Sequence, residues 1–368
     1  MKFRKVKVLM VLGNTSRCGA QTFAVNILKG IDRDQFQVDF AVYNNPKNGY
    51  GDEIIGLGGR IHIIPQYLIY NQIHYEKVFA RICKDYDIVH GHVSSTASIY
   101  LRIAKGLGCK TIVHSHSAGY RGNAMMQYIK KLYTKNAKKY ADRWFACSDL
   151  AAERLFGNTH RNNPIYYRIP NAIDVSLYRY NYEVRRKIRV RHGIDMNTFV
   201  CGHVGSFTTP KNHYFLLDIF KQILSRNSSA KLILCGDGDL MSSVKEYTAH
   251  LGLSNSVIFT GNIPNVNEYL MAMDVFVFPS LFEGFPTVAI EAQAAGLYIV
   301  ASDRITREVS LTSNIMYLSL ESSAIEWSEA ILQLKEVDKL EANDFISKTR
   351  YNLMFSVKDI SNIYKQLL

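Results

Sequence analysis

Two series of short apolar runs, each run followed by an amphipathic segment, constrain most strongly how this chain can fold. The first series occupies residues 3–174, and the second begins at Phe199. Apolar runs that alternate with helical segments predict parallel strands whose sheet is covered by helices on both faces. Because such a sheet binds ligands beyond the carboxyl ends of its strands, the residues that follow each strand are the candidates for function.

The predicted strands of the first series are residues 6–12, 38–42, 60–64, 87–92, 110–114, 143–147 and 166–169. Those of the second series are residues 199–204, 231–235, 257–259, 274–278 and 298–301. A chain of 368 residues with 47% hydrophobic composition can bury two cores. We therefore predict an α/β fold with two Rossmann-like domains, joined by a helix-bearing linker up to residue 197, and helical segments over 322–335 and 339–368.

The positive charge lies in the first half of the chain. Residues 1–174 carry 25 Lys and Arg against 12 Asp and Glu, whereas residues 175–368 carry 19 against 20. A basic face attracts anionic lipid, nucleic acid or polyphosphate without selecting among them. The sequence contains no nucleic-acid reader motif and no aromatic residues interleaved with the lysines, so a nucleic-acid-binding protein is the weaker alternative.

The cysteines and the apolar runs indicate a protein of the cytoplasm. The six cysteines are scattered without a Cys-x-x-Cys motif, which argues against a disulfide framework or a zinc site and for a reducing compartment. No apolar run approaches the roughly 18 to 20 residues of a membrane-spanning helix. The run 8–12 is too short for the core of a signal peptide, and we interpret it as a strand.

Residues 278–292, FPSLFEGFPTVAIEA, combine a strand end, a proline turn and a helix start. The first N–H groups of a helix lack intrahelical partners and carry the positive end of the dipole, so a phosphate can bind over Gly284, Phe285 and Thr287. Pro286 suits the first turn because it has no N–H to satisfy. Glu291 can reach vicinal hydroxyls, and Glu283 precedes the phosphate site. The alternative is an ordinary turn with two surface glutamates.

This stretch resembles the Glu-x7-Glu signature of the family 4 retaining glycosyltransferases. The resemblance implies the GT-B arrangement, two Rossmann-like domains with a cleft between them. It places the acceptor-binding domain at residues 1–174, the nucleotide-sugar-binding domain at 175–350, and a helix that crosses back to the first domain at 351–368. It also implies that Glu283 contacts the donor sugar and Glu291 the ribose. Residues 48–61 and 86–92 resemble stretches of capsule and exopolysaccharide enzymes of this family.

Two further loops resemble the donor site of the family. The loop 13–21 has no G-x-G-x-x-G, which weakens a dinucleotide reading, and only Gly19 matches the glycine-rich loop of the family. In the loop 205–213, Lys211 is kept, but Ser206 stands where an arginine is expected. Because the leaving diphosphate needs fixed positive partners, we expect compensation from Arg304 or Arg307. The resemblance places base recognition at the main chain near Asn262 and Val266.

Four histidines lie at the ends of two predicted strands, at positions 90, 92, 114 and 116. Such a group is expected to face a cleft, and the resemblance places His116, with His114 as second choice, near the reacting sugar. A metal site is the alternative, but fitting acidic partners are missing. Asp237 and Asp239 form an Asp-x-Asp pattern that we interpret as a turn and helix cap rather than a metal site.

A basic helix is predicted over residues 121–143. A helix of this kind can lie on anionic lipid, although a half-buried helix with a solvated face is an equal alternative. Its cations are the candidates for a membrane or acceptor face: Lys130, Lys131, Lys135, Lys138 and Lys139.

Taken with these features, the resemblance implies a metal-independent retaining glycosyltransferase with a UDP-sugar as donor and a lipid-linked or saccharide acceptor. It would need no cofactor, since the nucleotide-sugar is a substrate, and Glu283 and His116 would be its catalytic residues. The expected setting is bacterial capsule or exopolysaccharide biosynthesis in the cytoplasm, with peripheral contact at the inner face of the plasma membrane. A nucleotide-sugar epimerase or phosphorylase of the same fold is the alternative.

Overall fold

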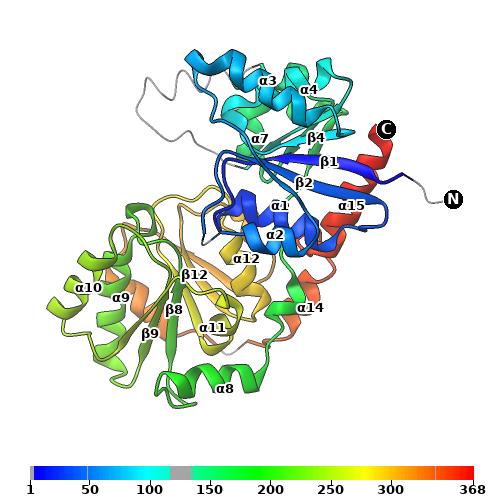
Figure 1. Ribbon diagram of the computed structural model, residues 1–368. Helices are drawn as coiled ribbons and strands as arrows, with labels where there is room; N and C mark the ends of the chain where they lie inside the picture. The colour runs from blue at the N-terminus through cyan, green and yellow to red at the C-terminus, as the bar shows by residue number, and fades with distance from the viewer. Residues whose placement is uncertain (1–3, 48, 117–133, 135, 336) are drawn as a thin grey trace. The chain divides into compact units, whose positions relative to one another are not determined.

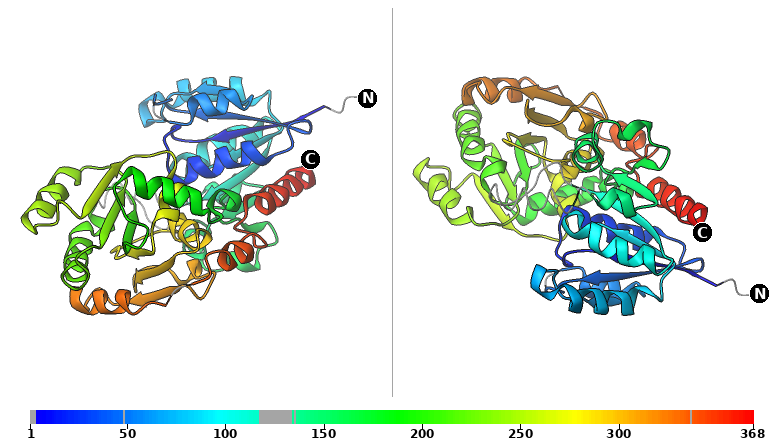
Figure 2. Two further views of the ribbon diagram at one scale, coloured as in Figure 1. Left: turned by 90° about the horizontal axis from the view of Figure 1, so that it is seen from below. Right: turned by 90° about the horizontal axis from the view of Figure 1, so that it is seen from above.

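The computed structural model describes residues 4–47, 49–116, 134, 136–335 and 337–368. The chain divides into two compact units, the first made of Met1–Ala172 with Arg350–Leu368 and the second of Ile173–Thr349. Each unit contains one sheet whose hydrogen-bonded strand pairs are all parallel, with helices packed against it (Figures 1 and 2). The predicted α/β class with two Rossmann-like domains is confirmed.

The first unit has a seven-stranded sheet in the order β3-β2-β1-β4-β5-β6-β7. All seven strands were predicted, and their ends agree with the prediction to within two residues. The strands are β1 (Val6–Val11), β2 (Phe36–Val42), β3 (Ile61–Ile63), β4 (Ile88–Gly91), β5 (Lys110–Ser115), β6 (Arg143–Ala146) and β7 (Tyr166–Arg168).

Helices bury both faces of this sheet. Val8 and Met10 of β1 belong to the core under α1 and α15, whereas Leu9 and Val11 are buried on the other face. The C-terminal helix α15, red in Figure 1, therefore packs on the first unit. The helical elements are α1 (Gly19–Gly30), α2 (Gly51–Gly56), η1 (Ile69–Asn71), α3 (Gln72–Cys83), η2 (Ser94–Thr96), α4 (Ala97–Gly106), α6 (Ala137–Tyr140), α7 (Asp149–Phe156), η3 (His160–Asn162) and α15 (Leu353–Leu367).

The second unit has a six-stranded sheet in the order β10-β9-β8-β11-β12-β13. Five of its strands were predicted, and β13 was missed. All four residues of β13 are apolar but only partly buried, because this strand lies at the edge of the sheet and pairs with β12. The strands are β8 (Val200–Val204), β9 (Lys231–Cys235), β10 (Val257–Gly261), β11 (Val275–Phe278), β12 (Tyr298–Ser302) and β13 (Ile315–Leu318).

One face of the second sheet packs under α9, α10 and α13 around the buried Trp327, and α12 contacts β12. The helical elements are η4 (Val175–Tyr178), α8 (Tyr182–Arg191), η5 (Thr209–Lys211), α9 (His213–Arg226), α10 (Met241–His250), α11 (Val266–Ala272), α12 (Thr287–Ala294), η6 (Arg307–Val309), α13 (Ala324–Leu332) and α14 (Glu341–Ile346). In the described part of the chain, no helix has the length and apolar content to cross a membrane.

Two predicted helical boundaries are wrong. The segment 339–368 is not one helix, because α14 ends at Ile346 and α15 starts afresh after Asn352, whose side chain accepts from the N–H of Met354. The predicted helix 121–143 extends too far, since α6 ends at Tyr140 and β6 begins at Arg143. Residues 121–133 and 135 of that segment lie outside the described residues.

Candidate functional site

Loops at the carboxyl edge of the second sheet are joined by backbone hydrogen bonds. Because β10, β9 and β8 are parallel neighbours, the loops that follow them meet at one edge of the sheet. The N–H of Gly236 donates to Gly261 O at 2.9 Å, and the N–H of Gly205 donates to Cys235 O at 2.9 Å. The loops that follow β8, β9 and β10 therefore form one continuous surface at the carboxyl ends of these strands.

Gly236 is required by this packing. Its φ is +141°, and a Cβ there would lie 2.0 Å from Gly205 O. The next residue, Asp237, accepts from Phe207 N through its main-chain oxygen at 3.0 Å. A turn before α10 is formed at Asp239 and Leu240, where the N–H of Met241 donates to Gly238 O at 3.0 Å, and Leu240 rather than an aspartate occupies the N-cap of α10.

A second junction brings Lys211 and Glu283 together. The N–H of Leu281 donates to Pro210 O at 2.8 Å, and Asn212 Nδ2 donates to Pro279 O at 3.1 Å, so the loops after β8 and β11 run side by side. Lys211 Nζ lies 2.5 Å from Glu283 Oε1. The two side chains are only 17% and 12% exposed, which makes this a largely desolvated ion pair.

The start of α12 is suited to an anion. Pro286 precedes the helix with extended backbone and makes no side-chain cap, so the first N–H groups of the helix have no capping side chain. Thr287 is the first residue of α12, and Phe285 is buried just ahead of it. The N-terminal end of a helix carries partial positive charge, so this position can hold a phosphate close to Lys211 on the neighbouring loop.

Glu291 lies one turn further along α12 and is half-buried. Desolvation raises the pKa of its carboxyl to about 7, and a hydrogen bond from the Tyr178 hydroxyl opposes this rise in pKa. Tyr178 belongs to η4, at the beginning of the second unit. Tyr178 was not predicted as a site residue, because no local spacing in the sequence connects it with α12.

The position of the missing arginine and the two arginines expected to compensate for it have local contacts. Ser206 is exposed, and its hydroxyl lies 3.4 Å from Thr208 Oγ1. Arg304 lies beside Asp303 at 3.8 Å, and the guanidinium of Arg307 stacks 3.5 Å from the ring centre of Tyr317. Both arginines follow β12 at the same edge of the sheet as Lys211.

The two residues predicted for base recognition follow β10. Val266 is the first residue of α11, and Asn262 is exposed in the loop before it. They therefore lie at the same sheet edge as Lys211 and Glu283, at its β10 end.

In the first unit, the four histidines form two hydrogen-bonded chains. His116 Nδ1 donates to Asn171 Oδ1 at 3.3 Å, and His116 Nε2 is 2.8 Å from His92 Nδ1. The hydroxyl of Tyr364, on α15, is 2.7 Å from His90 Nδ1, and His90 Nε2 is 3.3 Å from the ring of His114 at Nδ1.

The expectation that all four histidines face a cleft is wrong for His90 and His114, which are fully buried. Desolvation is the main cause that lowers the pKa of each ring, with a smaller effect from neighbouring rings at His90, His92 and His114. The pKa is about 3 for His90 and about 4 for His116, so both are neutral near pH 7. Alternation along a strand predicts which residues share one face of the sheet. It does not predict whether a residue on that face is fully buried or lies at a cleft.

The same group is the one set of side chains among the described residues that could gather around a metal ion. His90, His92 and His114 each place a ring nitrogen within 4.8 Å of the others. However, the facing nitrogens of His90 and His114 already contact each other at 3.3 Å, and an ion would have to replace that contact. The group therefore fits a hydrogen-bonded network better than a preformed metal site.

The remaining predicted residues lie elsewhere in the first unit. Gly19 opens α1, preceded by the exposed Cys18. Lys138 and Lys139 are exposed on α6, where Lys138 Nζ donates to Phe156 O at 3.4 Å. The other cations predicted for a membrane or acceptor face lie outside the described residues: Lys130, Lys131 and Lys135.

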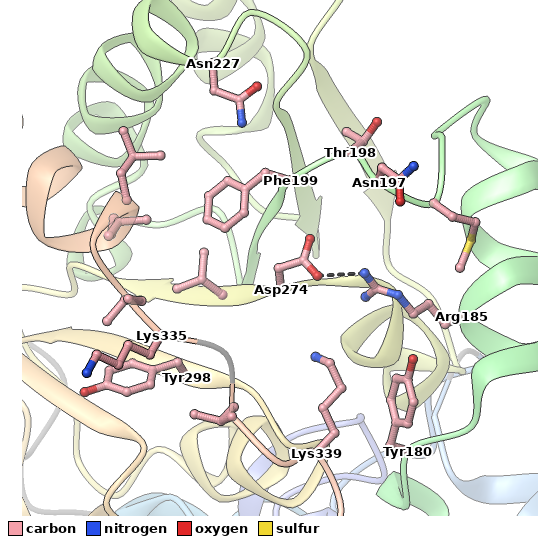
Figure 3. Close-up of a pocket in the computed structure, with 16 residues that line it drawn as sticks. Tyr180, Arg185, Asn197, Thr198, Phe199, Asn227, Asp274, Tyr298, Lys335 and Lys339 are labelled. Atoms are coloured by element: carbon pink, nitrogen blue, oxygen red, sulfur yellow. Dashed lines mark hydrogen bonds and ion pairs between the residues drawn. The ribbon is translucent and has the colours of Figure 1, made fainter.

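A cavity of about 690 Å³ in the second unit lies away from these residues (Figure 3). Its lining includes Phe199, Asp274 and Tyr298, at the amino ends of their strands and thus at the edge opposite to Lys211. The dashed line in Figure 3 marks the ion pair of Arg185 with Asp274, 2.7 Å long. Arg185 also donates to the main-chain oxygens of Met271 and Met273. The charges of Arg185 and Asp274 therefore stabilise the fold of the second unit.

Comparison with known sequences identifies domains in both halves. Residues 18–177 match the model of "Glycosyltransferase Family 4", and residues 198–336 match that of "Glycosyl transferases group 1". The chain is 29% identical to EpsF of Bacillus subtilis, named as a glycosyltransferase, over 99% of this chain and 97% of that one. It is 20% identical to the capsular polysaccharide biosynthesis glycosyltransferase CapH of Staphylococcus aureus, over 98% of each.

Two other relatives extend the comparison. The chain is 25% identical to the Escherichia coli UDP-Gal:alpha-D-GlcNAc-diphosphoundecaprenol alpha-1,3-galactosyltransferase, over 82% of this chain and 79% of that one. Among solved structures, Alr3699/HepE of Anabaena in complex with UDP has a TM-score of 0.81 at 17% identity and covers 98% of this chain and 100% of that one. With two parallel-sheet domains and matches to both family models, the chain belongs to the family 4 glycosyltransferases of GT-B fold.

Proposed function

We propose that this glycosyltransferase retains the anomeric configuration of a UDP-sugar, works without a metal, and transfers the sugar to a lipid-linked or saccharide acceptor in bacterial surface polysaccharide biosynthesis. The names of CapH and of the E. coli galactosyltransferase support the setting and a diphosphoundecaprenol-linked acceptor. The UDP complex of HepE supports a uridine diphosphate leaving group.

The observation that carries the proposal is the order of charges along the carboxyl edge of the second sheet. Lys211 and the start of α12 offer positive charge to a diphosphate, and Glu283 and Glu291 lie on either side of that helix start. A diphosphate bound there would leave Glu283 for the transferred sugar and Glu291 for the ribose hydroxyls. The main chain at Asn262 and Val266 would read the base.

The charge that develops on the leaving diphosphate would be stabilised by Lys211, by Thr287 and by the main chain at Phe285. A metal ion performs this task in other enzymes. Ser206 supplies no charge, so Arg304 or Arg307 would have to turn from Asp303 or Tyr317 toward the diphosphate to contribute. If Arg304→Ala and Arg307→Ala both leave turnover unchanged, this compensation does not operate.

His116 would contact the transferred sugar rather than act as a general base. Both of its ring nitrogens are engaged, by Asn171 and His92, and a group with a pKa of about 4 is a weak proton acceptor at neutral pH. Its hydrogen bonds hold the imidazole in one orientation, which suits a positioning role.

Thermal unfolding with UDP, GDP and ADP and with their sugar conjugates tests the proposal. A bound donor stabilises the folded state by mass action, so UDP and one UDP-sugar should raise Tm, with or without a chelator. Glu291→Ala should abolish this rise, whereas Glu246→Ala, an exposed glutamate on α10, should keep it. An unchanged rise in Glu291→Ala, or release of an altered UDP-sugar without any acceptor, would overturn the proposal. The anomeric configuration of the product, read by NMR, decides retention.

A further inference from the structure

Four large apolar side chains project into solvent at the start of α3. Leu68 is 40% exposed, Ile69 71%, Tyr70 87% and Ile73 73%. We call these four residues the apolar tip. Soluble proteins rarely expose contiguous apolar groups of this size unless they bind a membrane or another protein.

The apolar tip is not needed to anchor α3 in the fold. The opposite face of the helix supplies the buried residues Tyr75, Phe79 and Cys83, spaced four apart. Ile73 lies two positions before Tyr75, which places it on the other side of a helix with 3.6 residues per turn. The exposed side chains are therefore additional to those that pack the first unit.

The backbone that carries the apolar tip is held by specific contacts. The N–H of Leu68 donates to Asn71 Oδ1 at 2.8 Å, and Asn71 Nδ2 donates to Gln66 O at 2.9 Å. The ring of Tyr67 packs edge-on against the buried ring of Tyr75, with 5.4 Å between centroids. The turn thus presents its apolar side chains in a fixed direction.

Cations follow the apolar residues along the same stripe of the helix. Within α3, Ile73, Lys77 and Arg81 are spaced four residues apart, so they lie on one face, and Ile69 belongs to the turn η1 that precedes the helix. In the part of the chain that the structure describes, Lys77 and Arg81 have no acidic partner, because the nearby Glu76 pairs with Arg102 at 2.7 Å. From Ile73 to Arg81 the helix rises by about 12 Å.

We propose that the apolar tip inserts into a lipid bilayer with an anionic surface, with Lys77 and Arg81 at the level of the phosphate headgroups. Apolar side chains of interfacial helices enter the boundary of the acyl region by about 5 to 10 Å, and cations near the surface bind anionic lipid. Tyr70, the most exposed of the four, has the amphipathic ring that is favoured at such interfaces.

Charge argues for lipid and against a second copy of this chain. Residues 1–174 carry 25 basic against 12 acidic side chains, so two copies joined through this part would bring like charges together. An anionic bilayer is attracted by the same charges. The inference does not rest on the proposed function, because vesicle binding needs neither donor nor turnover.

Co-sedimentation of the full chain with vesicles tests the proposal. Vesicles of phosphatidylcholine mixed with phosphatidylglycerol should bind the wild type, and pure phosphatidylcholine vesicles should bind it less. Ile69→Ser with Ile73→Ser should weaken binding by at least about tenfold, which corresponds to about 1.4 kcal/mol. Lys77→Gln with Arg81→Gln should remove the preference for phosphatidylglycerol.

The matched control is Val190→Ser with Phe345→Ser, two apolar side chains of the second unit that are 66% and 54% exposed. It should bind vesicles like the wild type. Equal binding of the wild type to both vesicle types, or an equal loss in the control, overturns the proposal. The proposal is also overturned if the Ile69→Ser, Ile73→Ser protein still binds vesicles and light scattering shows that it has changed from a dimer to a monomer. The rise of Tm with UDP, measured on the same variants, reports donor binding separately.

Discussion

Lys211 Nζ lies 2.5 Å from Glu283 Oε1, so the cation predicted to hold the diphosphate and the carboxylate predicted to hold the sugar pair with each other. The contact joins loops that follow β8 and β11 and are 72 residues apart in sequence. A donor that bound between them would have to separate or share this pair. The ion pair therefore sets the position of both side chains before any chemistry.

Replacing Lys211 by alanine should lower kcat by about 10² to 10³, the usual effect of losing one group that stabilises developing negative charge. The loss of positive charge acts on the leaving diphosphate more than on the bound ground state, so KM for the donor should change less than kcat. Steady-state kinetics with the UDP-sugar found by thermal unfolding provides the measurement. Lys221→Ala, an exposed lysine on α9, is the control. Turnover of Lys211→Ala within twofold of the wild type would contradict the assignment.

Donor affinity should rise with pH around the pKa of Glu291, which is about 7. Only the ionised carboxylate accepts hydrogen bonds from both vicinal hydroxyls, so UDP should bind more tightly at pH 8 than at pH 6. In Tyr178→Phe the hydrogen bond that lowers this pKa is absent, and the midpoint should move to higher pH. Titration calorimetry across this range is the measurement, and an affinity that is independent of pH counts against Glu291 as the ribose ligand.

The same carboxyl predicts a stability effect of opposite sign. Its pKa is raised from 4.5 to about 7 in the folded protein, so between these values the folded state holds a proton that the unfolded state has lost. Stability therefore falls as pH rises through this window. Glu291→Gln should raise Tm at pH 8 but not at pH 4.5, while Glu246→Gln should change it at neither pH. A lower Tm of Glu291→Gln at pH 8 would refute this reading.

The buried histidines should make the protein sensitive to acid. The pKa values of His90, His92, His114 and His116 are all lowered in the folded state, so below pH 6.5 only the unfolded chain takes up their protons. Their contribution to stability is complete above pH 6.5 and is lost as pH falls, by about 1.4 kcal/mol per pH unit for each ring. Urea unfolding at pH 7.5, 6.5 and 5.5 measures the slope.

The exposed His74 on α3 provides the control for this slope. His74→Gln should leave the dependence of the unfolding free energy on pH unchanged. A wild-type unfolding free energy that stays constant from pH 7.5 to 5.5 is incompatible with neutral buried rings.

Asp274 should be a major stabilising residue of the second unit. Its carboxylate accepts from Arg185 at 2.7 Å, from the fully buried Arg189 at 2.8 Å, and from the N–H of Val200 at 2.8 Å. Asp274→Ala leaves a buried guanidinium without its carboxylate, which typically costs about 3 to 5 kcal/mol. Urea unfolding measures the loss. Asp303→Ala, at the exposed pair with Arg304, should change stability by less than about 1 kcal/mol, and an equal effect of both substitutions would show that burial is not the cause.

Much of the candidate site could be predicted because its parts are local. The strand end, the turn at Pro286 and the start of α12 are encoded within about fifteen residues, and Lys211 follows its strand in the same way. Tyr178 could not be found from the sequence, since it reaches Glu291 only through the packing of η4 against α12. The expected help from Arg304 and Arg307 concerned side-chain direction, and their neighbours Asp303 and Tyr317 decide that.

Local sequence patterns predict the two parallel sheets and the residues that follow their strands, because hydrophobic periodicity and turn residues act over a few positions. Tertiary structure alone decided the pairing of Lys211 with Glu283, the contact of His90 with Tyr364, which is 274 residues away, and the exposure of Ile69 and Ile73. Periodicity states which residues share a face of an element. Which faces become buried, and which distant side chains meet there, depends on how the elements pack.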